Sequence, residues 1–298
     1  MASPQRPRQP FGAFALLGCV ALSLSGCGTV AVLSPAGTIA EQNKELLLGA
    51  LAIMLAIVIP TIIAIVGFAW WFRAGNPNAR YRPNFEYSGQ LELVVWSIPA
   101  LTVLLLAGVI WVGSHKLDPA EPLEGKGDPL TVQVVSLDWK WLFLYPDQKI
   151  ASVNQLVAPA GVPLKLELTS GSVMTAFFVP QWGSMIYTMN GMVTHLNLRA
   201  DQPGDYRGTA TQISGDGFSD MHFAARAVSA QDFASWIKGA SIGQTGFDEA
   251  AYRELSQQGL ARPEVRPLVD ATLFDDIVSQ KIPPAPGPTP DVRPTPGG

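Results

Sequence analysis

Two long apolar runs constrain the fold of this sequence more than any other feature. Leu46–Phe72 and Leu93–Ser114 contain no charged residue, and each is longer than the roughly 20 residues that cross a bilayer core as a helix. Pro60 and Pro99 lie inside the runs, where a proline is tolerated in a membrane helix. We therefore expect a transmembrane hairpin over residues 46–115. The alternative is a pair of buried helices in a soluble protein, which such runs with matching flanks rarely form.

The charges beside the runs predict the orientation of the hairpin. The connecting loop carries Arg73, Arg80 and Arg82 against Glu86 and Glu92, whereas the outer flanks are balanced or acidic. Because basic loops stay on the cytoplasmic side, this loop is expected inside the cell. Both outer ends and the whole chain after the second run are then expected outside.

The start of the chain has the pattern of a bacterial lipoprotein signal. Arg6 and Arg8 precede an apolar stretch of about 14 residues, which suits a signal-peptide core and is short for a membrane span. The stretch ends in Leu24-Ser25-Gly26-Cys27, which resembles a lipobox. We predict a signal peptide over 1–26, diacylglycerol on Cys27, and an outside segment over 27–45. The alternative is a retained third span with an ordinary cysteine.

Composition excludes several classes of function. The net charge of -4 and a charged fraction of 15% offer no basic surface for nucleic acid. The two cysteines, Cys19 and Cys27, both precede the first apolar run. The part beyond the hairpin therefore has no thiolate for a metal and no disulfide.

After a linker over 116–129, the pattern of the sequence changes to short apolar alternation with frequent turn residues, which predicts a β-sandwich or barrel over 130–228. The expected strands are Leu130–Leu137, Lys140–Tyr145, Val153–Val157, Pro163–Thr169, Val173–Val179, Ser184–Met189, Val193–Ala200, Asp205–Thr211 and Met221–Ala227.

The periodicity is helical over 229–281. Capping-box patterns occur at Ser229 with Asp232 and at Thr245 with Asp248, and Gly259 is a plausible stop. The expected helices are Ala230–Lys238, Phe247–Gln258 and Leu268–Gln280. The proline-rich end, 282–298, is expected to be disordered.

Two stretches give this layout a family resemblance. Ser136–Tyr145, with Trp139 and Trp141, resembles the aromatic segment of subunit II of the haem-copper oxidases, and Pro180-Gln-Trp-Gly183 resembles its mid-domain loop. The similarity covers about residues 27–281. It implies a membrane-anchored α+β protein, in which a two-helix hairpin precedes a cupredoxin-like Greek-key β-barrel with C-terminal helices.

The resemblance is informative about copper. In the cytochrome c oxidase branch, one histidine and a Cys-x3-Cys-x3-His-x2-Met run hold a dinuclear copper centre, because copper needs thiolates and imidazoles. The corresponding positions here are Thr175, Ala210, Ser214, Phe218 and Met221. Only Met221 keeps a ligand type, and it is expected in the core. Trp139 and Trp141, where electrons enter in the copper branch, are likewise expected to pack in the core.

The quinol oxidase branch, of the cytochrome bo type, lacks this copper centre. Membership implies a non-redox scaffold of a proton-translocating quinol oxidase, with no cofactor in this chain and with haems and one copper in subunit I. The implied partners are subunit I, subunits III and IV, membrane lipid, and quinol through subunit I, without cytochrome c. The implied location is the bacterial inner membrane, as a two-pass lipoprotein with its N-terminus and C-terminal domain in the periplasm. Glu92 is the implied proton-entry residue.

Two other interpretations stay open from the residues. A stand-alone membrane lipoprotein with a copper-free domain for a ligand or partner fits the same layout. A copper-bearing electron-entry subunit conflicts with the absent thiolates. His115, His195 and His222 have no carboxylate or thiol at a ligand spacing, so they are expected to be surface or packing residues.

Overall fold

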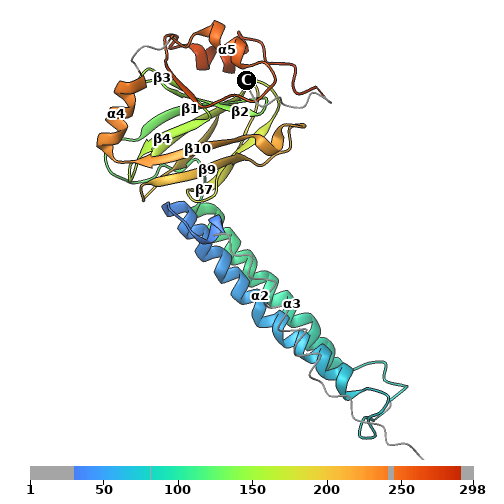
Figure 1. Cartoon of the computed structure of the whole chain (residues 1–298). Helices are drawn as coiled ribbons and strands as arrows, with labels where there is room; N and C mark the ends of the chain where they lie inside the picture. The colour runs from blue at the N-terminus through green and yellow to red at the C-terminus, as the bar shows by residue number, and fades with distance from the viewer. Residues whose placement is uncertain (1–29, 81, 241–244, 290–298) are drawn as a thin grey trace, which may run out of the picture.

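Two long helices form the predicted hairpin (Figure 1). The computed structural model describes residues 30–80, 82–240 and 245–289. After a short 3-10 helix, η1 (Ala31–Leu33), come α2 (Thr38–Trp71) and α3 (Gly89–Lys116), both long and apolar enough to cross a membrane. Helix α2 begins eight residues before its predicted apolar run and ends at Trp71, and α3 extends past its predicted run at both ends, because polar flanking residues continue the helices.

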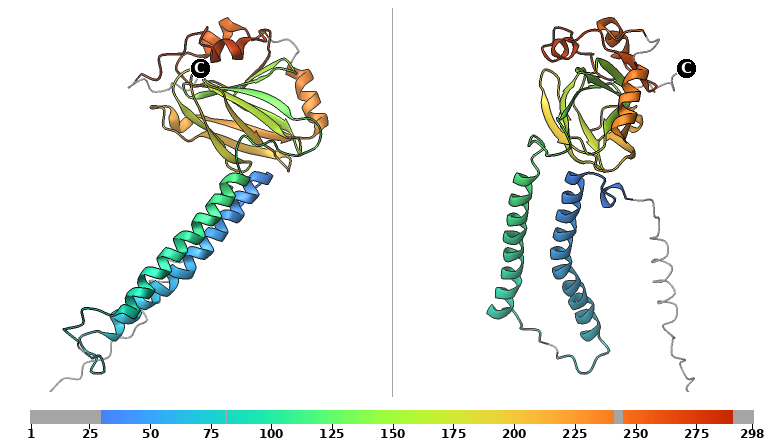
Figure 2. Two further views of the ribbon diagram at one scale, coloured as in Figure 1. Left: turned by 180° about the vertical axis from the view of Figure 1, so that it is seen from behind. Right: turned by 90° about the vertical axis from the view of Figure 1, so that its left-hand side faces the viewer.

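The apolar side chains of the hairpin are exposed on all sides. Leu46 packs on Gly113 near the outer end, but Ile63 and Leu104 remain 65% and 69% exposed. Figure 2 shows both helices running side by side away from the β-domain. The hairpin therefore leaves apolar surface for lipid or for other membrane helices.

Two sheets face each other in the β-domain. The first has the order β11 (Glu264–Pro267), β3 (Ile150–Val153), β2 (Lys140–Tyr145), β1 (Leu130–Leu137), β5 (Leu164–Ser170) and β8 (Thr194–Leu198). The second has the order β4 (Gln155–Pro159), β10 (His222–Val228), β9 (Gly204–Ala210), β6 (Thr175–Val179) and β7 (Gly183–Thr188). The pairs β1–β5 and β4–β10 are parallel and the others antiparallel. The predicted cupredoxin-like sandwich on a membrane hairpin is thus confirmed.

The aromatic segment lies at the centre of this domain. Trp139, Trp141, Phe143 and Tyr145 alternate into the core between the sheets. Trp141 meets the ring of Phe177 edge to face, with centroids 5.4 Å apart. The prediction that Trp139 and Trp141 pack in the core is confirmed, since their exposures are 1% and 0%.

One predicted strand is in fact two strands. The alternation of Val153–Val157 continues through Asn154, but Asn154 has φ of 53° and separates β3 from β4, which belong to different sheets. Its side chain accepts a hydrogen bond from the Trp141 amide at 2.8 Å and donates one to the Ala261 carbonyl at 2.7 Å. Asparagine tolerates this left-handed conformation better than most residues do, so the chain turns here from one sheet to the other.

The C-terminal segment comprises α4 (Ala230–Ala240), α5 (Glu249–Leu255), strand β11 and α6 (Leu273–Val278). Helix α4 packs through Phe233 and Ala240 on the core between the sheets, whereas α5 and α6 cover the outer face of the first sheet. Residues of α5 and α6 pack on Leu142 and Leu144, which point away from the core between the sheets. Ser229 caps the start of α4, since its Oγ accepts from the Asp232 amide at 3.1 Å; the Asp232 carboxylate accepts from the same Oγ at 2.7 Å.

Other predictions for this segment were wrong in their bounds. Asp248, rather than Thr245, is the N-cap of α5 and accepts from the Ala251 amide at 2.9 Å. That helix ends at Leu255, before Gly259. The predicted helix from Leu268 begins only at Leu273, because Leu268 forms a bridge with Phe247, and β11 was not predicted.

Residues 282–289 run along the domain instead of leaving it, and we call them the strap. The Ala285 amide donates to the Gly171 carbonyl at 2.9 Å, and the Thr289 amide donates to Gln258 Oε1 at 2.9 Å. The expectation of disorder was therefore wrong for this stretch, since it forms specific backbone contacts. Residues 290–298 and the lipobox cysteine Cys27 lie outside the described residues.

Candidate functional site

Thr175, Ala210, Ser214, Phe218 and Met221 stand where the copper-binding branch has its ligands, and we call them the copper-loop positions. Four of them, all but Phe218, lie together at one end of the sandwich. Thr175 begins β6 and donates to the Gln212 carbonyl at 3.4 Å, while Ala210 ends β9 and donates from its amide to the Met221 carbonyl at 3.1 Å. Ser214 Oγ lies 4.0 Å from Met221 Sδ. All four side chains are buried, Met221 to 1% exposure, as expected for a core residue.

Phe218, the fifth position, begins the short helix η2 (Phe218–Asp220). This helix directly follows the loop of residues 214–217, which packs on Trp139. Trp139 has φ of 67°, a strained value for a large residue, and its indole Nε1 donates to the Ser214 carbonyl at 2.9 Å. A Cβ on Gly217 would lie 2.2 Å from Cδ2 of the same ring. The loop therefore packs directly on the indole.

This donor set does not fit a dinuclear copper centre. Hydroxyl, methyl and phenyl groups stand where copper would need thiolates and imidazoles, and one thioether does not hold the metal. Within residues 30–80, 82–240 and 245–289, no group of three or more His, Cys, Asp or Glu side chains is placed to bind a metal ion.

The strap covers the copper-loop positions from outside. A Cβ on Gly215 would lie 3.1 Å from Pro288, and one on Gly287 would lie 2.9 Å from Val173. Strap residues thus lie against the loop that contains Gly215 and packs on Trp139, and against Val173 just before β6. This cover was not visible in the sequence, where the strap has only the composition of a disordered tail.

A buried charged pair lies at the start of β2. Asp138 accepts from Ser172 Oγ at 2.5 Å, and Lys140 Nζ donates to the Gln257 carbonyl at 2.5 Å. Burial raises the pKa of Asp138, while burial lowers the pKa of Lys140 to about 8 and the nearby Asp138 partly opposes that change. Sequence reasoning missed the pair, although a lysine within an otherwise apolar strand was a visible signal.

The mid-domain loop is the joint between domain and hairpin. The Ala36 amide donates to the Gln181 carbonyl at 2.8 Å, and the Asp201 amide donates to the Ala36 carbonyl at 2.7 Å. Gly183 has φ of 108°, and a Cβ there would lie 2.6 Å from Cγ2 of Ile39. Only glycine fits at this close approach.

Arg199 reinforces the joint from the side. Its guanidinium pairs with Asp201 at 2.5 Å and also donates to the Thr38 hydroxyl and to the Glu124 carbonyl. The Thr38 hydroxyl in turn donates to Asp201 at 2.8 Å. One side chain thus links the first residue of α2, the linker and the β8–β9 connection.

Glu92 lies in the first turn of α3, at the inner end of the hairpin. Its side chain is exposed and has no hydrogen bond or ion pair with the described residues. In the isolated chain it is therefore available to solvent or to a neighbouring subunit.

The three histidines lie apart on separate elements and are not fully buried. His115 contacts the Trp111 carbonyl at 2.9 Å near the outer end of α3, His195 lies opposite Glu167 on the neighbouring strand, and His222 begins β10. All three are exposed, as expected for surface residues.

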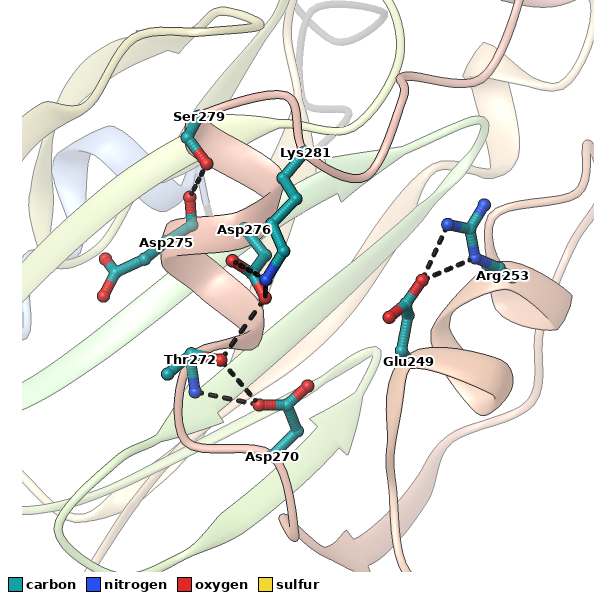
Figure 3. A network of polar contacts seen from close by, with 8 residues as sticks. All are labelled: Glu249, Arg253, Asp270, Thr272, Asp275, Asp276, Ser279 and Lys281. Carbon is teal, nitrogen blue, oxygen red and sulfur yellow. Dashed lines mark hydrogen bonds and ion pairs between the residues drawn. The ribbon is translucent and has the colours of Figure 1, made fainter.

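A second polar network lies on the C-terminal segment (Figure 3). Both carboxylate oxygens of Asp276 accept from Lys281 at 3.0 Å, and Thr272 links Asp276 to Asp270. Such exposed pairs contribute little to stability individually. The network fixes the ends of α6 and offers no arrangement for catalysis.

Hairpin, joint and cupredoxin-like sandwich together define the class: a membrane-anchored cupredoxin-like protein of the oxidase subunit II type. No family model matches the chain. It is 42% identical over 262 residues to "Ubiquinol oxidase subunit 2" of Acetobacter aceti, covering 87% of this chain and 85% of that protein. It is 41% identical over 247 residues to "Cytochrome bo(3) ubiquinol oxidase subunit 2" of Pseudomonas aeruginosa, covering 83% and 74%.

More distant relatives have related names. "Quinol oxidase subunit 2" of Bacillus cereus is 34% identical, covering 80% of this chain and 83% of that protein. The solved periplasmic domain of cytochrome oxidase subunit II of Bradyrhizobium japonicum is 25% identical, with a TM-score of 0.37, covering 39% of this chain and 96% of that structure. The chain belongs to the ubiquinol oxidase subunit 2 family. It is a membrane-anchored protein with a periplasmic domain.

Proposed function

We propose that this chain is the non-redox second subunit of a proton-translocating ubiquinol oxidase in the aerobic respiratory chain. The observation that carries the proposal is the copper-loop end of the sandwich, where Trp139 and Met221 are packed and no thiolate or imidazole is present among the five positions. The names of the relatives agree with this role.

The exposed helices support assembly with a larger membrane subunit. Both spanning segments carry apolar side chains on every side, while the domain is held firmly at their outer end. We propose that α2 and α3 pack on a haem-copper subunit I, with subunits III and IV completing the complex. Haems and one copper would reside in subunit I, and quinol would reach it through the bilayer. No cytochrome c is then needed as a donor.

The test is purification in mild detergent through a tag after Gly298. Co-elution of a haem-bearing subunit with quinol-dependent oxygen uptake, and without the absorption of a dinuclear copper centre, is the expected result. A colourless protein that elutes alone from actively respiring membranes would overturn the proposal in favour of a stand-alone lipoprotein. Absorption from dinuclear copper would overturn the non-redox role.

For Glu92 we propose a part in proton uptake by the complex. Its carboxylate lies at the inner end of a membrane helix and has no partner among the described residues, and ionisable groups at such positions are often functional. Exchange for glutamine should lower oxygen uptake at unchanged haem content. Glu86→Gln, which removes a carboxylate from the loop just before α3, is the matched control. Equal turnover of the two variants would remove the assignment.

Cys27 is proposed as the lipidated first residue of the mature chain, which would make the protein a two-pass lipoprotein of the inner membrane. Cys27→Ser should abolish incorporation of labelled fatty acid and leave the signal peptide uncleaved, as read by intact mass. Retention of the label would contradict lipidation at this residue. Because the hairpin already anchors the chain, membrane attachment should survive the change.

A further inference from the structure

A cavity lies in the loop between α2 and α3. It has a volume of about 890 Å³ and is lined by Arg73, Arg80 and Arg82 together with the aromatic rings of Trp71 and Phe85. No acidic residue lines it in the part of the loop that the structure describes. Three positive charges therefore face one cavity without a carboxylate to neutralise them.

The three arginines are not equivalent. Arg73 is held in place, since it donates to the Trp70 carbonyl at 2.8 Å and its Cζ lies 4.9 Å from the centroid of the Trp70 ring. Arg80 and Arg82 are exposed and have no hydrogen bond or ion pair with the described residues. Two guanidiniums beside a fixed third are thus available to an external anion, for which their forked geometry suits phosphate.

The position of the cavity at the membrane indicates the source of that anion. Trp70, Trp71 and Phe72 form the end of α2 and are 62%, 46% and 58% exposed, as expected for side chains at the level of lipid headgroups. A ligand in this cavity would therefore have its phosphate among the guanidiniums and its apolar part beside the aromatic rings. Basic pockets at the cytoplasmic surface of membrane helices bind anionic headgroups in this way.

From this geometry we propose that the loop holds the headgroup of an anionic phospholipid of the inner leaflet. The outer end of the hairpin offers a contrast, because Lys44 and Lys116 there are accompanied by Glu41, Glu45 and Asp118. A lipid with two phosphates, such as cardiolipin, matches three guanidiniums better than phosphatidylglycerol with one. The assignment depends on the orientation of the hairpin and not on the oxidase activity.

The test is native mass spectrometry of the full chain in detergent, titrated with cardiolipin, phosphatidylglycerol or phosphatidylcholine. We expect the chain to retain cardiolipin most strongly and phosphatidylcholine least. Arg80→Gln with Arg82→Gln should weaken cardiolipin binding roughly 25-fold, since each basic residue near the surface contributes about a fivefold effect. Lys44→Gln with Lys116→Gln removes the same charge at the outer end and should change binding less than about twofold.

Two further measurements keep the proposal falsifiable if the glutamine variant inserts poorly. Arg80→Lys with Arg82→Lys keeps the loop charge that sets orientation but removes the forked donors, so intermediate binding is expected. Millimolar inorganic phosphate should not displace cardiolipin, because it lacks the apolar part. Equal loss in the inner and outer variants, no lipid preference, or displacement by phosphate alone would each overturn the assignment.

Discussion

Replacing Gly183 with alanine tests the joint between the domain and the hairpin. The backbone there has φ of 108°, and an added Cβ would lie 2.6 Å from Cγ2 of Ile39 and 2.7 Å from the amide nitrogen of Ala40. Both contacts are shorter than real Cβ contacts, and one of them is with the backbone of α2. The alanine must therefore separate the mid-domain loop from the start of the helix.

The cost has two parts that a second glycine separates. The positive φ costs alanine about 1–2 kcal/mol, and forcing an extra methyl group into a packed region costs about 1–3 kcal/mol. Gly127 has φ of 77° with nothing within 4 Å of a built Cβ, so Gly127→Ala bears only the backbone cost. For a domain of this size each kcal/mol lowers Tm by about 2–4 °C. We expect losses of about 2–8 °C for Gly127→Ala and about 4–20 °C for Gly183→Ala.

Thermal unfolding followed by near-ultraviolet circular dichroism would measure both variants in detergent. A cysteine in place of Ala40, which is only 4% exposed, gives a local measurement through its rate of maleimide labelling. The label should react slowly with the otherwise native chain and rapidly when Gly183→Ala is added. If the two alanine variants lose the same Tm and the cysteine stays protected, the joint does not depend on this close approach.

Three further predictions concern the domain. The pKa of Lys140 is about 8 in the folded state and 10.5 in the unfolded state, so between pH 8 and 10 the unfolded state binds more protons. The free energy of unfolding, measured in urea titrations, should therefore rise by about 2–3 kcal/mol from pH 8 to 10. Lys140→Met should remove that rise. Gly217→Ala should destabilise the domain by about 1–3 kcal/mol in the same assay, since its Cβ would meet the Trp139 ring at 2.2 Å; an unchanged midpoint would contradict the packed loop. Truncation after Lys281 removes Ile282, which is 4% exposed, and should lower the free energy of unfolding by about 1.5–3 kcal/mol. It should also increase acrylamide quenching of tryptophan fluorescence. Unchanged quenching would mean that the strap does not cover the loops.

Much of the fold could be predicted because its signals are local. The hairpin follows from two uncharged runs and the arginines between them, and most strands follow from alternation bounded by turns. The break at Asn154 could not be predicted, because its left-handed conformation depends on hydrogen bonds to Trp141 and Ala261 from other parts of the chain. Strand β11 is only four residues long and ends in Pro267, too short a run to predict a strand, and it exists through its pairing with β3.

The candidate site also has features that the sequence predicts and features that it does not. The residue types that stand at the copper-loop positions are readable directly, and they suffice to predict that the ligand set is incomplete. The conformation of Trp139 and the cover by the strap were not readable, since both arise from contacts between segments far apart in sequence. Likewise, Gly183 stood in a recognisable motif, but its partner Ile39 lies on the other side of the hairpin in the chain.

The pairing of early strands with late ones sets the order in which this domain can be made. Strand β4 receives its sheet neighbour only when β10 is present, and β3 receives its outer neighbour only with β11. Such non-local pairings form slowly, and unpaired strand edges promote aggregation until they are closed. With α2 and α3 inserted first, the nascent domain would wait outside as a tethered, incomplete sandwich. Its first sheet can gain its last strand, β11, only after residues 264–267 have crossed the membrane. Completion of folding therefore depends on export of nearly the whole chain.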